Sequence, residues 1–354
     1  MFLRSVTVIL LLQAVIGCSK SQKKSEPNID KPAPVITTFT NPLLSSGPDP
    51  WVIQKDGYYY YMNTQGSQVS ILKTKTLSQL NRAEVTVAYK APATGADSKN
   101  IWAPELHFLN NKWYIYYTAG SSGDLATQRM FVLENSSADP TKGAWVVKGQ
   151  IKDNNADFFA IDATVFSSDG KNYIIWSGHI SASDNTQRLY IAQLANEPWK
   201  MATARVEIST PTYDWEKIGL PYVNEGPEIL KNQKGKTFLI FSASGCWTDD
   251  YSLGMITLKD NGDPLKPIDW TKTDKPVFTK KPENGAYGPG HNSFFKSPDG
   301  TEDWILYHAN PRGGLACSND RSPRMQKFTW NADGTPNFGE PVKIDTPILK
   351  PSGE

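Results

Sequence analysis

The segment Asp49-Pro-Trp-Val-Ile-Gln-Lys-Asp-Gly-Tyr-Tyr-Tyr-Tyr-Met62 contains the pattern that decides the fold of this chain. A short apolar stretch is followed by an Asp-Gly pair and then by a run of aromatic residues. Asp-Gly accepts the positive φ angles of a tight turn, and aromatic and β-branched residues favour strands. The segment therefore predicts a β-hairpin.

Four later segments repeat this pattern, with Gly, Asn or Asp at the turn: 104–117, 162–176, 226–241 and 292–307. Further strand-like stretches follow, such as 188–193 and 252–257. Successive repeats begin roughly 55 to 70 residues apart, the length of a four-stranded blade with long loops. Pro and Gly recur too often for long helices. We therefore predict an all-β fold, a five-bladed β-propeller with the active site in its central channel. A two-sheet sandwich is the alternative, but it does not explain a fivefold repeat.

Composition excludes some classes of partner. The 354 residues carry a formal net charge of +1, which gives no electrostatic reason to expect binding to nucleic acid or to an anionic membrane surface. Aromatic residues are numerous, with 11 Trp, 15 Tyr and 14 Phe. They fit a strand-rich protein, and the same rings can stack on sugars.

The N-terminus is typical of a targeting segment. Arg4 precedes an apolar run, 6–15, that is too short to span a bilayer. The run ends in Val15-Ile16-Gly17-Cys18, which resembles the lipobox of bacterial lipoproteins. A plain signal peptide containing a chance cysteine is the alternative, but the polar stretch 19–34 that follows favours a tether.

These features predict three regions. Residues 1–18 are a lipoprotein signal peptide that ends at Cys18, the lipidation site; residues 19–38 are a flexible polar tether; and residues 39–354 are the propeller. We expect an exported lipoprotein of the bacterial cell envelope, periplasmic or on the outer surface. The only membrane contact is then through the N-terminal lipid, and we expect a monomer.

Cys246 and Cys317 remain in the mature chain and lie in different repeats. An oxidising compartment permits a disulfide between them, but two buried thiols are equally consistent with the sequence. No CxxC or HExxH pattern occurs, which argues against a structural zinc site.

Candidate functional residues lie just ahead of the five hairpins. In a propeller the first strand of each blade lines the channel, so these residues should converge on one face: Asp49, Trp102 with Glu105, Asp162, Glu225 and His291. An aspartate before a strand often caps a turn, which would explain Asp49 alone. Three carboxylates at nearly one register are better explained by a shared site.

Paired carboxylates in a polar channel with aromatic walls are typical of enzymes that hydrolyse glycosidic bonds. One carboxyl must stay protonated to donate to the leaving oxygen, so burial or neighbouring negative charge has to raise its pKa. A second must stay ionised to take a proton from water. A third can orient the acid and keep its pKa high.

Five short motifs resemble the successive blade motifs of glycoside hydrolase family 43, in the family's order. They are Gly47-Pro-Asp-Pro50, Ile101-Trp-Ala-Pro-Glu105, Ile161-Asp-Ala-Thr-Val-Phe166, Asn224-Glu-Gly-Pro227 and Gly288-Pro-Gly-His-Asn292. Each alone is weak, but together they extend the resemblance over about residues 39–349.

The resemblance implies a role for each channel residue. Asp49 would be the general base, Asp162 the residue that modulates the acid's pKa and orients it, and Glu225 the general acid of an inverting hydrolase. His291 matches the family's channel histidine, which lies by a bound calcium or another hard cation. The sequence is equally consistent with a His291 that only makes hydrogen bonds in the channel and binds no metal. No organic cofactor is expected.

Within the family, two parts of the chain look closest to exo-acting α-L-arabinofuranosidases. They are Trp102-Ala-Pro-Glu105 with Lys112–Tyr117, and the ending Arg321–Pro336. The substrate implied is a plant or microbial oligo- or polysaccharide. β-Xylosidase, arabinanase and β-galactofuranosidase activities share the scaffold, and a non-catalytic glycan-binding propeller is the rival of another class. Retention of all three carboxylates argues against that rival, since binding alone needs no acid with a raised pKa.

Four further residues are candidates for substrate contact. We expect Trp102 to act as a stacking platform and Glu105 to line the same site. Arg321 or Arg324 could reach the channel and bind a sugar hydroxyl, although a surface ion pair explains either one equally well.

Overall fold

The computed structural model describes Met1 and residues 37–354. The predicted signal peptide, Cys18 and most of the tether lie outside the described residues, so the structure does not test them. Within the described residues, none of the helices combines the length and hydrophobicity that a membrane crossing requires.

Five four-stranded antiparallel sheets, each built from consecutive strands, confirm the five-bladed propeller. Blade 1 contains β2 (Trp51–Lys55), β3 (Tyr58–Met62), β4 (Gln68–Thr74) and β5 (Glu84–Lys90). Blade 2 contains β6 (Lys99–Leu109), β7 (Lys112–Gly120), β8 (Arg129–Asn135) and β9 (Val146–Gln150). Blade 3 contains β10 (Ala160–Ser168), β11 (Lys171–Gly178), β12 (Arg188–Gln193) and β13 (Val206–Ser209). Blade 4 contains β14 (Asn224–Lys231), β15 (Thr237–Ala243), β16 (Ser252–Leu258) and β17 (Trp270–Lys272). Blade 5 contains β18 (Tyr287–Lys296), β19 (Asp303–Asn310), β20 (Ser322–Trp330) and β21 (Pro336–Asn337).

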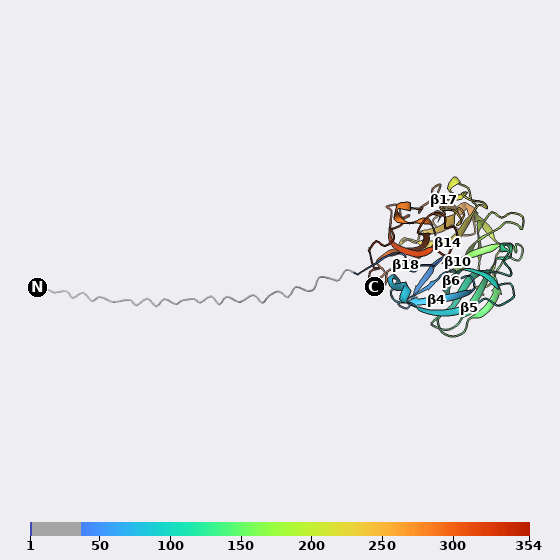
Figure 1. Cartoon of the computed structure of the whole chain (residues 1–354), viewed down its shortest axis with the longest axis horizontal. Coiled ribbons are helices and arrows are strands. Elements are labelled where there is room, and N and C mark those ends of the chain that lie inside the picture. The colour runs from blue at the N-terminus through green and yellow to red at the C-terminus, as the bar shows by residue number, and fades with distance from the viewer. Residues whose placement is uncertain (2–36) are drawn as a thin grey trace. The chain divides into compact units, whose positions relative to one another are not determined.

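Each repeat found in the sequence forms the first two strands of one blade. In Figure 1 the labels of β6, β10 and β14 lie near the middle of the domain and those of β5 and β17 nearer its rim. The hairpin turns have the predicted backbone: Asp56 and Gly57 have φ of 53° and 76°, and Asn110 and Asn111 have φ of 50° and 60°. Both central residues are left-handed, as in the turns that match the twist of paired strands.

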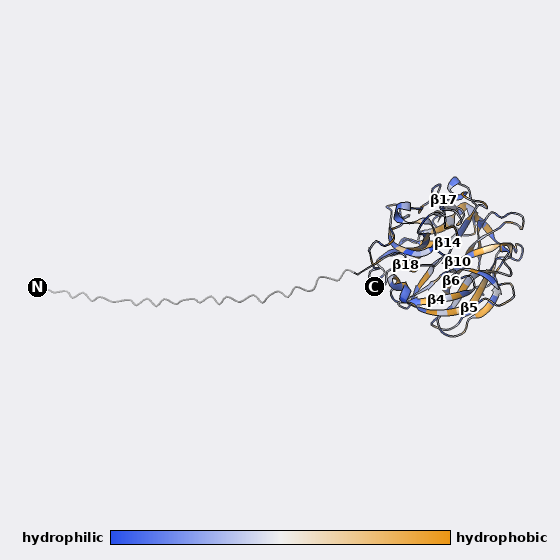
Figure 2. Ribbon diagram, in the orientation of Figure 1, coloured by the Kyte–Doolittle hydropathy of each residue, from blue (hydrophilic) through white to orange (hydrophobic). Residues whose placement is uncertain are grey.

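The hydrophobic core consists of five clusters, one between each pair of neighbouring blades. Between blades 1 and 2, for example, Tyr60 packs on the fully buried Trp113 with ring centroids 5.4 Å apart. Figure 2 shows the hydrophobic residues concentrated along the strands and the hydrophilic ones in the loops. The abundant aromatic residues therefore serve mainly to fill wedge-shaped gaps between twisted sheets.

The two ends of the described chain close the ring. No blade mixes strands from both ends; instead β1 (Thr38–Phe39) pairs with β22 (Ile348–Leu349) beside blade 5. The buried side chain of Asn41 donates to the carbonyl of Met325 at 2.9 Å and accepts from its N–H at 3.0 Å. Segment 37–47 is thereby fastened to β20, which fixes the first blade against the last.

Five short 3₁₀ helices lie in the connections: η1 (Leu77–Arg82), η2 (Leu125–Thr127), η3 (Asp214–Glu216), η4 (Pro267–Asp269) and η5 (Pro282–Asn284). At η1, the carboxylate of Glu354 accepts hydrogen bonds from the N–H groups of Leu77 and Ser78. The C-terminal residue thus caps a helix of blade 1.

Candidate active site

A residue in the left-handed region lies in the first strand of each blade or, in blade 1, two residues before it. The five residues occupy corresponding positions: Asp49 (φ 55°), Ala103 (40°), Asp162 (57°), Gly226 (52°) and His291 (46°). For residues other than glycine this backbone costs on the order of 1–3 kcal/mol each, and such strain gathers at functional sites. Only Gly226 has the conformational freedom to adopt it without that cost.

Each of these five residues is tied to the preceding blade through its main-chain N–H. The acceptors are His308 Nδ1 for Asp49 (3.0 Å), Thr64 Oγ1 for Ala103 (2.7 Å), Thr118 Oγ1 for Asp162 (3.1 Å), Asp162 Oδ2 for Gly226 (3.1 Å) and Ser242 Oγ for His291 (2.8 Å). A continuous set of hydrogen bonds between blades therefore surrounds the channel and holds the strained residues in place.

Asp49 is buried and held as a carboxylate. Arg321 Nη1 donates to its Oδ1 at 2.8 Å, and Thr64 Oγ1 donates to its Oδ2 at 2.6 Å. Burial raises the pKa of Asp49, but the charge of Arg321, the neighbouring imidazoles of His291 and His308 and the Thr64 hydroxyl outweigh it and hold the pKa well below its ordinary value. Asp49 is thus ionised at neutral pH and can accept a proton.

Asp162 and Glu225 have the opposite environment. Burial and the negative charges of Glu225 and Asp49 raise the pKa of Asp162 well above its ordinary value. Burial, with a further contribution from Asp49, raises the pKa of Glu225 to about 7, although its carboxylate accepts the Tyr251 hydroxyl at 2.8 Å. The two carboxyls therefore retain a proton at a pH where isolated carboxyls would both be ionised.

His291 lies between the carboxylates. Its Nδ1 is 3.4 Å from Asp49 Oδ1 and 4.0 Å from Asp162 Oδ2. Asp162 in turn accepts the N–H of Gly226, the residue after Glu225. The structure therefore brings Asp49, Asp162, Glu225 and His291 together from four blades.

A second polar layer crosses the channel next to these residues. Trp51 Nε1 of blade 1 donates to Glu228 Oε2 of blade 4 at 3.2 Å, and Thr164 Oγ1 of blade 3 lies 3.3 Å from the same oxygen. Glu105 of blade 2 is buried here, with Oε2 at 2.8 Å from His107 Nε2. Burial raises the pKa of Glu105 and of Glu228 well above their ordinary values. This layer forms a floor to the channel, and a substrate contact by Glu105 stays a prediction.

The two arginines predicted to contact substrate have different surroundings in the structure. Arg321 reaches Asp49, whereas the guanidinium of Arg324 bonds the main-chain carbonyls of Gly285 at 2.7 Å and Ala309 at 3.1 Å. Arg324 is fully buried and is not brought to the carboxylates. Trp102 is half-buried in β6, opposite Thr118, and its stacking role stays a prediction.

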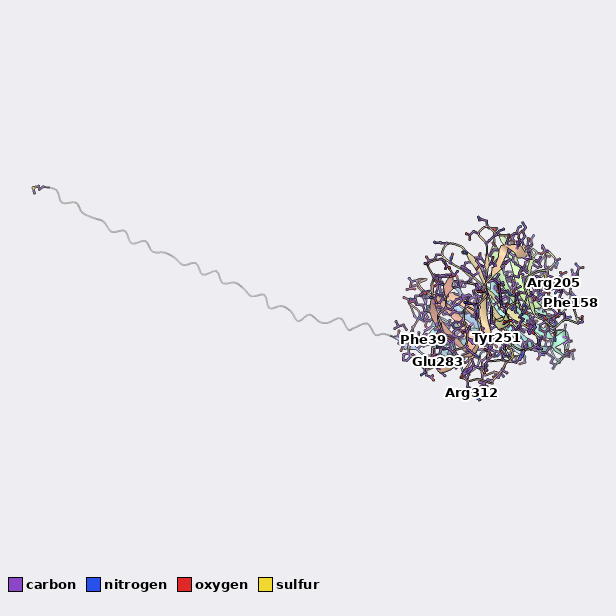
Figure 3. The ribbon with its side chains drawn as sticks, turned by 90° about the horizontal axis from the view of Figure 1, so that it is seen from above. Phe39, Phe158, Arg205, Tyr251, Glu283 and Arg312 are labelled. Carbon is purple, nitrogen blue, oxygen red and sulfur yellow. A yellow bond between two sulfur atoms is a disulfide. The ribbon has the colours of Figure 1, made fainter. Side chains whose placement is uncertain are left out.

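A disulfide joins Cys246 and Cys317, which the sequence left undecided. It links the β15–β16 loop (244–251) to the β19–β20 loop (311–321), and Gly314 N donates to Asp249 Oδ1 across the same pair of loops at 2.9 Å. The first loop supplies Tyr251 to Glu225 and the second supplies Arg321 to Asp49. Figure 3 shows Tyr251 well inside the domain and Arg312, from the second loop, at its edge. A disulfide here fits an oxidising compartment.

The residues around His291 do not fit a cation held by protein ligands alone. Nδ1 faces Asp49 and Asp162, so the ring has only Nε2 left for a metal. Asp49 is already bonded to Arg321 and Thr64. Calcium prefers six to eight oxygen ligands, and within residues 37–354 no group of three or more His, Cys, Asp or Glu side chains is arranged to hold a metal ion.

Sequence reasoning missed several residues of this site: Thr64, Glu228, Tyr251 and His308. His308 had a signal, because it lies near the end of the second strand of its blade, at the same register as Thr118 and Ser242 in theirs. Tyr251 lies in a loop of no regular pattern. Its contact with Glu225 depends on the fold.

Comparison with known proteins agrees with this geometry. A family model described as Glycosyl hydrolases family 43 matches residues 39–336. The extracellular exo-alpha-(1->5)-L-arabinofuranosidase of Streptomyces avermitilis is 40% identical over 348 residues, which cover 96% of this chain and 71% of that protein. The Streptomyces chartreusis protein of the same name is 39% identical over 287 residues, or 80% of this chain and 86% of that protein.

A solved structure of an arabinofuranosidase is also similar to this chain. The crystal structure of alpha-L-arabinofuranosidase from Lactobacillus brevis superposes with a TM-score of 0.81 at 36% sequence identity. The match covers 87% of this chain and 98% of that one.

Proposed function

The chain belongs to glycosyl hydrolases family 43, and from this we propose that it is an exo-acting α-L-arabinofuranosidase that works with inversion. Its substrate is an oligo- or polysaccharide, and the bond broken joins a terminal arabinofuranosyl unit to the rest of the chain. Similarity to two arabinofuranosidases at about 40% identity over most of the chain supports this choice of sugar. The other family activities named above lack comparable support.

The proposed reaction is a single displacement. Water attacks the anomeric carbon while Asp49 takes one of its protons, and the bond from that carbon to the leaving oxygen breaks. Glu225 gives its proton to that oxygen, so the products are free arabinose of inverted configuration and the shortened glycan. Asp162 and His291 orient the reacting carboxyls, and Arg321 keeps Asp49 ionised. No step passes through a metal.

One observation carries the assignment of acid and base. The surroundings of two neighbouring carboxyls push their pKa values in opposite directions: that of Asp49 falls well below the ordinary value, and that of Glu225 rises to about 7. A pair of titratable groups separated in this way supports Asp49 as the base. The pKa of Asp162 is raised as well, and the family resemblance gives the role of acid to Glu225 and that of orienting residue to Asp162.

The test of function is a panel of nitrophenyl glycosides. We expect hydrolysis of the α-L-arabinofuranoside and much slower hydrolysis of the β-xyloside and β-galactofuranoside. Proton NMR during the first minutes should show the β anomer of arabinose before mutarotation. Initial release of the α anomer would contradict inversion, and preference for another glycoside would contradict the substrate.

The activity should depend on pH in a predictable way. As pH rises through about 7, Glu225 loses its proton and kcat/KM should fall, because the acid form is required. On the acid side, activity should persist to below the ordinary pKa of an aspartate, because that of Asp49 is lowered. The measurement is kcat/KM against pH on a substrate whose leaving group needs protonation.

Tyr251→Phe is the matched control for this profile. The Tyr251 hydroxyl bonds the ionised form of Glu225 and so lowers its pKa. Removing the hydroxyl should move the alkaline limb to higher pH and leave the acid limb in place. An unmoved alkaline limb would assign that limb to another group.

The same pKa affects stability. Glu225 binds its proton more tightly in the folded state, so its contribution to stability is present below pH 4.5 and is lost as pH rises to about 7. At about 1.4 kcal/mol per pKa unit, the loss approaches about 3 kcal/mol. Glu225→Gln does not titrate, so its stability relative to wild type should increase over this interval. Denaturant unfolding at both ends of the interval measures the difference.

The cellular location is proposed in two parts. The two Streptomyces relatives are named as extracellular proteins, and the disulfide supports export. The anchor is a lipid on Cys18, which motif 15–18 and the polar stretch behind it support. A fatty-acid analogue should label the wild type in a bacterial host and not Cys18→Ala; equal labelling of both would exclude the anchor.

The cation near His291 remains a prediction. Should one bind, His291 Nε2 would supply a single ligand and water most of the others, and the ion would add positive charge near Asp49 and Asp162.

A further inference from the structure

Four large apolar side chains are exposed on two loops, one that leads from blade 3 into blade 4 and one within blade 4. Ile218, Leu220 and Tyr222 lie on the β13–β14 loop (210–223), and Trp247 lies on the β15–β16 loop. Their exposed fractions are 38%, 73%, 36% and 39%. We call these four residues the blade 4 patch. None of them has a part in the mechanism above.

The two loops form one unit. Gly245 N donates to the carbonyl of Ile218 at 2.9 Å, and Ile218 N donates to Ser244 Oγ at 3.1 Å. The main chain of Gly219 packs on the indole of Trp247, since a Cβ at that position would lie 2.7 Å from Nε1. One edge of the indole is thus fixed while the ring keeps exposed surface.

Buried polar contacts hold the base of the β13–β14 loop. Glu216 is fully buried, and its carboxylate accepts from Lys272 at 2.7 Å, from Asn224 Nδ2 at 3.0 Å and from the N–H groups of Thr212 and Tyr213. The Cys246–Cys317 disulfide fixes the other loop next to Trp247. The patch is therefore preorganised, which reduces the entropy lost when a ligand binds.

The residues of the patch lie close in the chain to those on the proton-donating side of the active site. Tyr222 is three residues before Glu225, so their Cα atoms lie within about 10 Å of each other. Trp247 is four residues before Tyr251, whose hydroxyl bonds Glu225. A general acid protonates the leaving oxygen, so the glycan that departs must extend from the Glu225 side of the channel.

We propose that the blade 4 patch binds the leaving-group sugars of the substrate, beyond the bond that is cut. This inference rests on the proposed function and assigns a region of the surface to the polysaccharide chain. The faces of furanose and pyranose rings carry C–H groups that pack on apolar and aromatic surfaces. The patch lies near the general acid, where the leaving-group sugars must extend. This favours a glycan over a second copy of the chain as the molecule that binds there.

The test compares a long and a short leaving group. Substrates are a linear arabino-oligosaccharide and 4-nitrophenyl α-L-arabinofuranoside, and the variants are Trp247→Ala and Leu220→Ala. Loss of an aromatic anchor should lower kcat/KM on the oligosaccharide about tenfold, mainly through KM. The loss on the nitrophenyl substrate should be several times smaller. Ile268→Ala is the matched control, because Ile268 is an exposed apolar residue of blade 4 that lies in η4, in the β16–β17 connection and outside both loops.

Two outcomes would overturn the proposal. Equal losses on both substrates would mean that Trp247 only supports Glu225. No loss on the oligosaccharide, together with a change from dimer to monomer by light scattering, would assign the patch to contact between two copies.

A binding measurement separates this proposal from the proposed function. Affinity electrophoresis in gels containing arabinan uses the inactive Glu225→Gln chain with and without Trp247→Ala. If the wild type cleaves no arabinofuranoside, the proposed function fails, and Trp247-dependent retardation would still place glycan on the patch. If the wild type cleaves it but retardation does not depend on Trp247, the patch proposal alone fails.

Discussion

Glu225→Gln should hydrolyse an unactivated arabinofuranosyl linkage about 10²- to 10⁴-fold more slowly than the wild type, because the leaving oxygen would depart without a proton. Glutamine keeps the size of the side chain and an acceptor for the Tyr251 hydroxyl at 2.8 Å. The loss should therefore come from chemistry and not from packing.

The leaving group distinguishes the acid from the base. On a dinitrophenyl arabinofuranoside, whose leaving group departs without protonation, Glu225→Gln should recover most of its activity. Asp49→Asn should stay impaired on both substrates, because water activation is needed in each. The measurement is kcat/KM for both variants on both substrates, with circular dichroism to confirm folding. Full activity of Glu225→Gln on the unactivated linkage would remove Glu225 from the mechanism.

Local patterns predicted the hairpins well. Asp56-Gly57 and Asn110-Asn111 favour a left-handed turn through their local chemistry, and the flanking aromatic stretches form the paired strands. The outer strands were harder to predict. β17 has three residues and β21 has two, so neither contains enough of an alternating pattern to be recognised.

The site was predictable only where a residue stands beside a turn motif. Asp49, Asp162 and His291 share one backbone position, and Glu225 stands one residue before the corresponding Gly226. Glu228 was missed because the register of β14 shifts between Glu225 and Glu228, so simple alternation misassigns its direction. Arg321 and Arg324 are three residues apart in one motif. The choice between them depends on a contact with Asp49, 272 residues earlier in the sequence.

Removing the disulfide should have the largest effect on stability. The Cys246–Cys317 bond closes a segment of 71 residues, and chain entropy predicts a loss of about 4 kcal/mol from the free energy of unfolding without it. The double variant Cys246→Ser, Cys317→Ser should therefore unfold at lower guanidinium concentration. Wild type treated with a reducing agent should match it, and the reducing agent should not change the double variant.

The same variant should lose activity well below its unfolding transition. Both linked loops hold a catalytic carboxyl: Tyr251 bonds Glu225, and Arg321 bonds Asp49 at 2.8 Å. Without the disulfide the two loops could move apart and both contacts could lengthen. Small misplacements of reacting groups lower the catalytic rate strongly. If Arg321 moves away, the pKa of Asp49 should rise, because that charge is the largest contribution that lowers it. The acid limb of kcat/KM should then shift to higher pH in the double variant. A loss of stability with an unchanged acid limb would show that the disulfide stabilises the fold without positioning Arg321.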